Sequence, residues 1–137
     1  MESENNCRRA EYRVVPDKAS IAAVSEFMDN TLEAIGASVK VANKAQIILD
    51  EIYSNIVYYS KAANAKITVV YDNDKLELIF EDDGLQYDPT NADEPDLTIP
   101  AAERKLGGLG ILMVRKLAKE LVYKYINGKN VLKVVLL

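Results

Sequence analysis

Apolar residues recur along this chain with two different periods. Spacings of three and four predict a first helix from about residue 18 to Ile35 and a second from about residue 39 to 60. We expect Asp17 and Ser38 to cap their N-termini and Gly36 to end the first helix. A third helix is predicted from Gly107 to about residue 120. Its apolar positions are Leu109, Leu112, Met113, Leu117 and Leu121.

Five shorter runs rich in β-branched and aromatic residues predict strands. They cover residues 11–15, 66–71, 76–81, 122–126 and 131–137. Turn residues, Asp72-Asn73-Asp74 and Asn127-Gly128, join two consecutive pairs into hairpins. Strands that come in hairpins, with helices grouped between them, favour an α+β fold. We expect a two-layer sandwich in which three helices cover one face of a mixed, mostly antiparallel sheet.

One long segment follows neither period. Residues 85–106 contain three prolines and five acidic residues, and an irregular loop of this length is usually functional. Residues 1–9 are polar and charged, so we expect a flexible tail there. The remainder, residues 10–137, has the length of one ordinary domain, with no repeat or linker.

Composition excludes several classes of function. The net charge of −4 argues against non-specific nucleic-acid binding, and no apolar run reaches the ~18 residues of a membrane span. A single cysteine, Cys7, leaves no internal disulfide, and the polar N-terminus is not a secretory signal, so we expect a cytoplasmic protein. The chain has no histidine. Acid–base chemistry must therefore fall to carboxylates, lysine or tyrosine.

Glu51 and Asn55 are four residues apart in the second helix, so they share one face at the edge of its apolar stripe. Mg²⁺ prefers oxygen ligands and takes few of them from protein. We hypothesise that Asn55 Oδ1 binds Mg²⁺ and that Glu51 orients or deprotonates an attacking hydroxyl. The alternative is a helix-edge pair satisfied by neighbouring backbone.

Asp82-Asp83-Gly84 follows the strand at 76–81. A carboxylate at a strand end can accept a hydrogen bond from the exocyclic amine of adenine, and Gly84 lets the backbone approach a flat base. Either Asp82 or Asp83 could read the base. The alternative is an acidic turn.

Gly107, Gly108 and Gly110 stand where the long loop becomes the third helix. Glycine costs about 1 kcal/mol against alanine inside a helix, so three in four positions need a reason. A helix start presents free N–H groups that suit phosphate, and Arg104 and Lys105 would add positive charge. Close packing is the alternative explanation.

Taken in order, these motifs resemble those of the Bergerat-fold ATPases, which include gyrase, a heat-shock chaperone and histidine kinases. The chain looks most like the stand-alone anti-sigma-factor serine kinases of bacteria. The N-box corresponds to Glu51–Asn55 and the first glycine box to Asp82–Gly84, followed by Tyr87-Asp88-Pro89. The second glycine box corresponds to Gly107–Gly110. The acidic, proline-containing segment between them resembles the ATP lid, and the similarity covers about residues 10–137.

This resemblance implies ATP and Mg²⁺ as cofactors. It implies Asn55 as the Mg²⁺ ligand, Glu51 as general base and Asp82 as the adenine-binding residue. Gly107, Gly108 and Gly110 would line the phosphates. The implied partners are a small anti-sigma-factor antagonist that is phosphorylated on serine or threonine, a sigma factor, and a second copy of the chain.

The sequence departs from the family pattern at Gln86, at Tyr58-Tyr59-Ser60 and at Lys105, none of which removes a residue needed for ATP. Two other functions would use the same residues. One is a module in which ATP gates binding to a regulator without phosphate transfer. The other is a histidine-kinase-like ATPase domain that works with a partner in trans.

Overall fold

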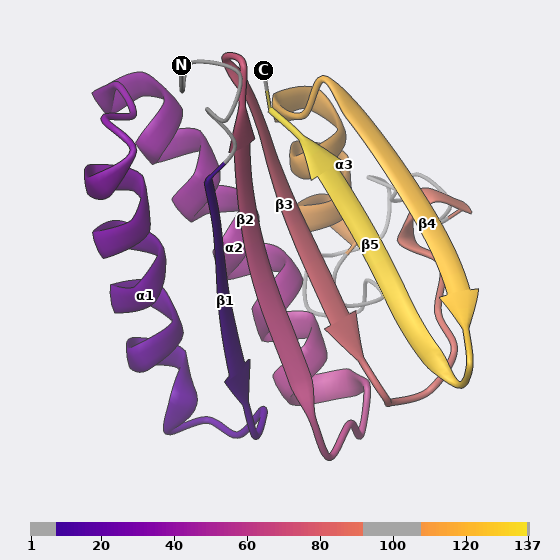
Figure 1. Cartoon of the computed structure of the whole chain (residues 1–137). Coiled ribbons are helices and arrows are strands. Elements are labelled where there is room, and N and C mark those ends of the chain that lie inside the picture. Colours follow the sequence, from indigo (N-terminus) through magenta and orange to yellow (C-terminus); the bar gives the residue numbers. More distant parts are fainter. Residues whose placement is uncertain (1–7, 92–107, 137) are drawn as a thin grey trace.

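The computed structural model describes residues 8–91 and 108–136 of the chain (Figure 1). Five strands, three α-helices and one 3-10 turn follow in a β-α-α-β-β-turn-α-β-β order. Their bounds are β1 Arg8–Val14, α1 Ser20–Ala34, α2 Val39–Tyr59, β2 Ala65–Asp72, β3 Lys75–Asp82, η2 Pro89–Asn91, α3 Gly108–Leu117, β4 Glu120–Ile126 and β5 Lys129–Val135.

The strands form one open sheet in the order β1-β2-β3-β5-β4, and every neighbouring pair in this described sheet is antiparallel. The expectation of a mixed sheet was therefore wrong. β3 and β4 do run in the same direction, since both are antiparallel to β5. The β4–β5 hairpin places β5 between them, so the two parallel strands never pair.

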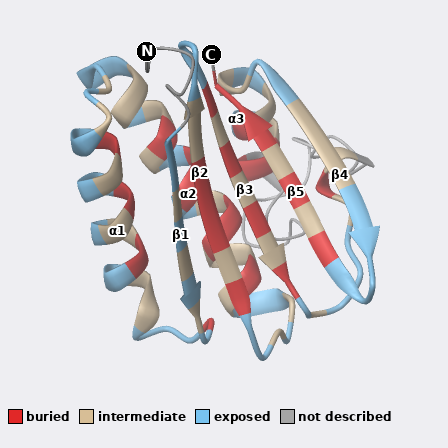
Figure 2. Ribbon diagram, viewed as in Figure 1, coloured by how far each residue is buried: buried red, intermediate tan, exposed pale blue. Residues whose placement is uncertain are grey.

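The helices lie together on one side of the sheet, which confirms the two-layer α+β arrangement (Figure 1). Inward positions of the strands alternate with outward ones, as Leu76, Leu78 and Phe80 of β3 show by being buried. Buried residues of α1 and α2 face these strands across a single apolar core (Figure 2). Such alternation is typical of a sheet that is covered on one face.

Helix ends follow local chemistry. Ser38 Oγ accepts a hydrogen bond from the Val41 N–H at 3.2 Å, which confirms its capping role. Gly36, at φ +74°, ends α1 in the motif that requires a left-handed residue. Asp17 was expected to cap α1, but Ala19 stands at that position and gives no side-chain cap. Asp17 instead bonds Ser20 through both its carboxylate and its carbonyl, closing a turn before the helix begins.

Strand boundaries depend on long-range pairing. β1 begins at Arg8 because Arg8 pairs with Tyr71, so two residues expected in the tail belong to the sheet. α3 ends at Leu117, three residues before the expected end, because Glu120 already pairs with Val135. Both predicted hairpin turns are confirmed, with positive φ at Asn73, Asp74, Asn127 and Gly128. Asp72, expected in the first turn, pairs with Lys75 and belongs to β2. Residues 1–7 of the tail, residues 92–106 of the predicted lid, and Gly107 lie outside the described residues.

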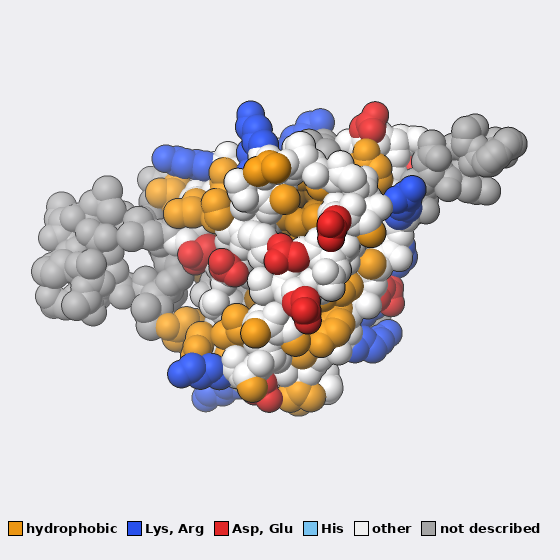
Figure 3. Space-filling model, turned by 90° about the vertical axis from the view of Figure 1, so that its left-hand side faces the viewer, with side chains coloured by type: hydrophobic (Ala, Val, Ile, Leu, Met, Phe, Trp, Pro, Cys, Tyr) orange, Lys and Arg blue, Asp and Glu red, His pale blue; other side chains and the backbone are white. Residues whose placement is uncertain are grey.

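The side of the molecule that carries α1 has an acidic centre. Acidic side chains gather in its middle, and Lys and Arg lie toward its rim (Figure 3). The outward face of α1 contributes Glu26, Asp29 and Glu33, all exposed. Among the described residues, no helix is both long and apolar enough to cross a membrane.

Candidate functional site

A cavity of about 480 Å³ lies between the C-terminal half of α2, the end of β3 and the β4–β5 hairpin. We call it the α2–β3 cavity. It brings together two residues singled out from sequence, Asn55 and Asp82, with Ile111 of α3. Its other walls are mainly apolar or aromatic, and they comprise Ile52, Ile56, Tyr59, Ser60, Phe80, Leu85, Gln86, Tyr87, Pro89, Tyr123, Asn130 and Leu132. A volume of this size suits a small ligand.

Asp82 is a buried carboxylate in the cavity wall, with 7% of its surface exposed. Its Oδ1 accepts hydrogen bonds from the Gly84 N–H at 2.9 Å and from Asn130 Nδ2 at 3.1 Å. No described residue donates to Oδ2. Burial raises the pKa of Asp82, the two hydrogen bonds oppose that rise, and the charge of Asp83 adds to it. The site thus offers one unpaired acceptor at the strand end.

Asp83 has a different role from its neighbour. It is exposed, and its Oδ1 accepts hydrogen bonds from the N–H groups of Ala63 and Asn64 at 2.8 and 2.9 Å. Asn64 Nδ2 donates to Oδ2 at 3.1 Å. These bonds to Asn64 and Ala63 lower the pKa of Asp83. Asp83 therefore holds the loop between α2 and β2, and of the two carboxylates it is Asp82 that lines the cavity.

Gly84 is needed for a contact between chain segments. A Cβ at this position would collide with the backbone carbonyl of Ser60, at the end of α2. The next residue, Leu85, donates its N–H to Ser60 O at 2.7 Å. The expectation was that this glycine admits a flat base, but the structure places its missing side chain against α2, and Gly84 is not among the residues lining the cavity.

Glu51 and Gly110 are in contact, so the first and third motifs meet. A Cβ on Gly110 would overlap the carboxylate of Glu51, because α3 begins where it crosses α2. Glu51 and Asn55 are both partly buried, and neither makes a hydrogen bond or ion pair with a described residue. Polar groups held near a core without protein partners are free to bind a ligand.

The remaining predicted residues divide into two groups. Gly108 is the first residue of α3. Arg104, Lys105 and Gly107 lie outside the described residues, so their expected contribution to a phosphate site stays a prediction. Within residues 8–91 and 108–136, no cluster of three or more His, Cys, Asp or Glu could hold a metal ion. A cation at Asn55 would therefore need ligands from the nucleotide, which is how Mg²⁺ commonly binds.

Sequence reasoning missed Asn130, which lies in the cavity wall with 6% of its surface exposed. It bonds Asp82, Leu85, Tyr87 and Tyr123. A signal was available, since Asn130 occupies the inward position that alternates with Leu132 and Val134 along β5. A polar side chain at a core-facing position needs several partners.

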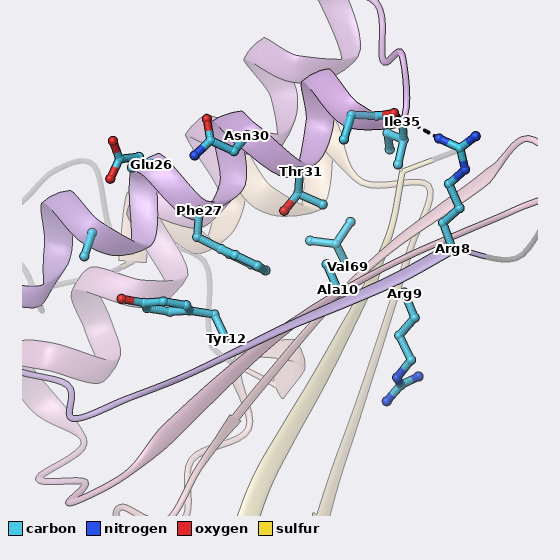
Figure 4. Close-up of a pocket in the computed structure, with 12 residues that line it drawn as sticks. Arg8, Arg9, Ala10, Tyr12, Glu26, Phe27, Asn30, Thr31, Ile35 and Val69 are labelled. Atoms are coloured by element: carbon cyan, nitrogen blue, oxygen red, sulfur yellow. Dashed lines mark hydrogen bonds between the residues drawn. The ribbon is translucent and has the colours of Figure 1, made fainter.

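A second cavity of about 490 Å³, the β1–α1 groove, lies beside the edge strand β1 (Figure 4). Tyr12 of β1 stacks on Phe27 of α1 with ring centroids 5.2 Å apart. Arg8 closes one end by donating to Ala34 O at 2.9 Å. None of the residues predicted for nucleotide binding lines this groove.

The fold is a two-layer α+β domain in which Glu51 lies against Gly110, and Asn55 and Asp82 line the α2–β3 cavity. Residues 14–136 match the family model described as histidine kinase-like ATPase domain. The chain belongs to this family, which confirms the suspected relationship to Bergerat-fold ATPases.

Among solved structures, the chain is similar to the RsbU and RsbW domains of Rv1364c from Mycobacterium tuberculosis. The TM-score is 0.64 at 13% identity, and the match covers 92% of this chain and 32% of that one. At this identity the likeness establishes the shared fold. A comparison with curated proteins found no match.

Proposed function

We propose that this chain is an ATP-dependent serine/threonine protein kinase of the anti-sigma-factor type. The observation that carries the proposal is the meeting of three motifs: Glu51 touches Gly110, and Asn55 and Asp82 share the adjoining cavity. Glu51 and Gly110 are 59 positions apart in the sequence, and Asn55 and Asp82 are 27 apart. Membership in an ATPase-domain family and the RsbW-containing structural relative support the proposal.

The cavity fits a nucleoside better than a charged metabolite. Its walls are mostly apolar or aromatic, as a flat base requires, and its buried acceptor, Asp82 Oδ2, suits the exocyclic amine of adenine. Asn55 lies on the α2 side of the cavity and offers an amide oxygen to the Mg²⁺ that accompanies ATP. The first N–H groups of α3, beginning at Gly108, have no partners within the helix and suit phosphate.

Bound Mg²⁺-ATP supplies the transferable phosphoryl group and part of the charge neutralisation. The protein supplies orientation and a proton acceptor. The Glu51 carboxylate lies against Gly110 in the first turn of α3, and it would accept the proton from the serine or threonine hydroxyl of a protein substrate. A carboxylate is the natural base in a chain that has no histidine.

The proposed partners follow from the same class. The substrate would be a small anti-sigma-factor antagonist, and its unphosphorylated form would compete with a sigma factor for this chain in the cytoplasm. The chain would act as a homodimer, and of the two edge strands of the described sheet, β1 and β4, we assign the dimer contact to β1. Nucleic acid and membrane are not among the proposed partners.

The test begins with nucleotide binding. Mg²⁺-ATP should raise the Tm of the wild type, and Asn55→Ala should abolish the Mg²⁺-dependent part of that rise. Asn43→Ala is the matched control, because Asn43 is an exposed asparagine of the same helix. An unchanged Tm at millimolar Mg²⁺-ATP would refute the nucleotide site.

Phosphate transfer is tested on the natural partner. A pull-down with and without ATP, followed by a phosphorylation assay on the recovered protein, should label serine or threonine. Glu51→Gln should bind ATP but lose transfer, whereas Asp50→Asn, at an exposed neighbouring position, should retain it. ATP-dependent capture without labelling would favour the gated binding module, and labelled histidine in the partner would favour a histidine-kinase-like domain.

A further inference from the structure

Asn130 uses its whole hydrogen-bonding capacity on the walls of the α2–β3 cavity. Its Nδ2 donates to Asp82 Oδ1 at 3.1 Å and to Leu85 O at 2.9 Å. Its Oδ1 accepts from the Tyr87 N–H at 3.0 Å and from the Tyr123 hydroxyl at 2.5 Å. Four contacts therefore tie β5 to β3, to β4 and to the segment that follows β3.

An asparagine amide has two donor hydrogens and two acceptor lone pairs, so these four bonds saturate it. The amide has one satisfactory orientation. Turning it over would place the NH₂ group against the Tyr87 N–H and the oxygen against the Asp82 carboxylate. Asn130 is left without a group to offer a ligand and can act only through the residues it holds.

The fixed Asn130 amide also orients the Asp82 carboxylate. Two donors, the Gly84 N–H and the Asn130 amide, fix Oδ1, and this leaves Oδ2 as the acceptor that can meet a ligand. The other bonds of the same amide hold the backbone of Leu85 and Tyr87, which also line the cavity. The direction of the acceptor and the position of this part of the wall are set by a single side chain.

We propose that Asn130 is a positioning residue that makes the cavity selective for a purine carrying a 6-amino group. It does so by aiming Asp82 Oδ2 at that amine while holding residues 85–87 at a fixed spacing from it. This inference rests on the proposed function, since it takes ATP as the ligand. A carboxylate oxygen accepts a hydrogen bond from a 6-amino group but makes none with the hydrogen at C6 of an unsubstituted purine. The preference for the 6-amino purine therefore measures how well Asp82 Oδ2 is oriented toward the amine.

The experiment compares the Kd of Mg²⁺-ATP with that of purine riboside triphosphate, which lacks only the 6-amino group. The wild type should prefer ATP by about 10- to 100-fold, the range expected for one hydrogen bond to a charged group. In Asn130→Ala and Asn130→Ser the preference should fall to about threefold or less. A role limited to stability would weaken both ligands alike and leave their ratio unchanged.

One variant serves as a matched control. Thr68→Val removes a buried hydroxyl that has no partner among the described residues and lies in the same sheet, away from the cavity. It should retain the wild-type preference for ATP.

A measurement on the wild type makes the test independent of how well variants fold. The Tyr87 amide hydrogen, held by Asn130, should exchange more slowly with ATP bound than with purine riboside triphosphate bound at equal saturation. The inference would be overturned if a folded Asn130 variant kept the wild-type ratio of the two Kd values, or if the Tyr87 amide exchanged equally fast with the two ligands. Either result would leave the proposed function standing. If the wild type binds neither nucleotide, the proposed function fails and the inference fails with it.

Discussion

Burial and hydrogen bonding shift the pKa of Asp82 in opposite directions in the folded state. Its burial disfavours the charged form, while two hydrogen bonds to Oδ1 favour it, and the balance raises its pKa. A carboxyl whose folded-state pKa is raised contributes stability below its unfolded pKa and loses that contribution as pH rises through the folded pKa. At neutral pH, which lies above the pKa of the unfolded state, the raised pKa of Asp82 therefore costs stability, as expected of a residue retained for binding.

Asp82→Asn should raise the Tm at pH 7, because the amide oxygen can still accept both hydrogen bonds without a buried charge. The advantage over wild type should disappear below the ordinary aspartate pKa, where both side chains are neutral. The same substitution should weaken ATP about 10- to 100-fold and improve inosine triphosphate relative to ATP, since an amide can donate to a 6-oxo group. Thermal scans from pH 3 to 8 and titrations with both nucleotides check this. A lower Tm at pH 7 would contradict it.

Gly110 controls the position of Glu51. In Gly110→Ala the new methyl would displace the Glu51 carboxylate, the flexible end of a long side chain, and alanine gains about 1 kcal/mol of helix propensity in return. We expect stability to change by no more than about 1 kcal/mol and ATP to bind nearly as in wild type. Phosphate transfer should fall by about 100-fold, as misplaced catalytic groups do.

A double-mutant cycle makes this prediction specific. Gly110→Ala should cost little further activity in a Glu51→Gln background, because the displaced group is already inactive. Fully additive losses would show that Gly110 acts on transfer by some route other than Glu51.

The sequence analysis named most of the residues of the candidate site but not Asn130. Glu51, Asn55 and Asp82 lie in motifs whose spacing is local, and the structure brings them to one end of the sheet. The choice between Asp82 and Asp83 required coordinates, because only pairing with the loop at residues 63–64 separates them. Asn130 was missed: its inward position in β5 marks a buried polar side chain, but its partners are distant in the sequence and only the coordinates identify them.

At the scale of elements, the junction between β3 and α2 sets the geometry of the cavity. The end of β3 passes so close to the end of α2 that only glycine fits at residue 84. The hydrogen bond from Leu85 to Ser60 continues the contact. The segment that leaves β3 is thereby directed along the cavity wall.

Gly84→Ala should destabilise the protein by about 1–3 kcal/mol, because the added Cβ meets rigid backbone that cannot rotate away. Urea denaturation gives the free energy of unfolding, and ATP affinity should fall as the 85–87 wall shifts. Gly110→Ala, whose added methyl meets a mobile side chain, is the contrasting variant. Equal stability of the two variants would contradict the packing argument.

Periodicity predicted all three helices and all five strands, since each amphipathic pattern is local. The ends of these helices and strands were predicted less accurately. β1 gains Arg8 and Arg9 through pairing with β2, and α3 gives up its predicted last turn to β4. The start of α1 was misplaced because Asp17 forms a local turn with Ser20 in preference to capping the helix.

At the scale of the molecule, the order of the strands leaves β1 and β4 as edges. The outward face of β1 carries Arg9, Glu11 and Arg13, of which the first two form an ion pair at 3.0 Å. Unpaired edges are the usual place for a second copy to add its strand. We assign the proposed homodimer to β1, and the variants below test this choice against β4.

Light scattering should give a mass near twice the 15.2 kDa of one chain. Glu11→Arg should shift the protein toward the monomer, because three like charges along β1 would repel those of its copy. Glu120→Arg, which changes the other edge strand β4, should leave the mass unchanged. A monomeric wild type at high micromolar concentration would refute the dimer.

The span of 48 positions between Asp82 and Asn130 has a consequence for biosynthesis. A domain generally folds as a unit once its chain has emerged from the ribosome. The acceptor at Asp82 is therefore exposed to solvent without its support until β5 has been translated. Nascent chains or truncated products that stop before β5 should not bind nucleotide. Nucleotide added during translation would therefore protect full-length molecules from proteolysis and leave the truncated ones to be degraded.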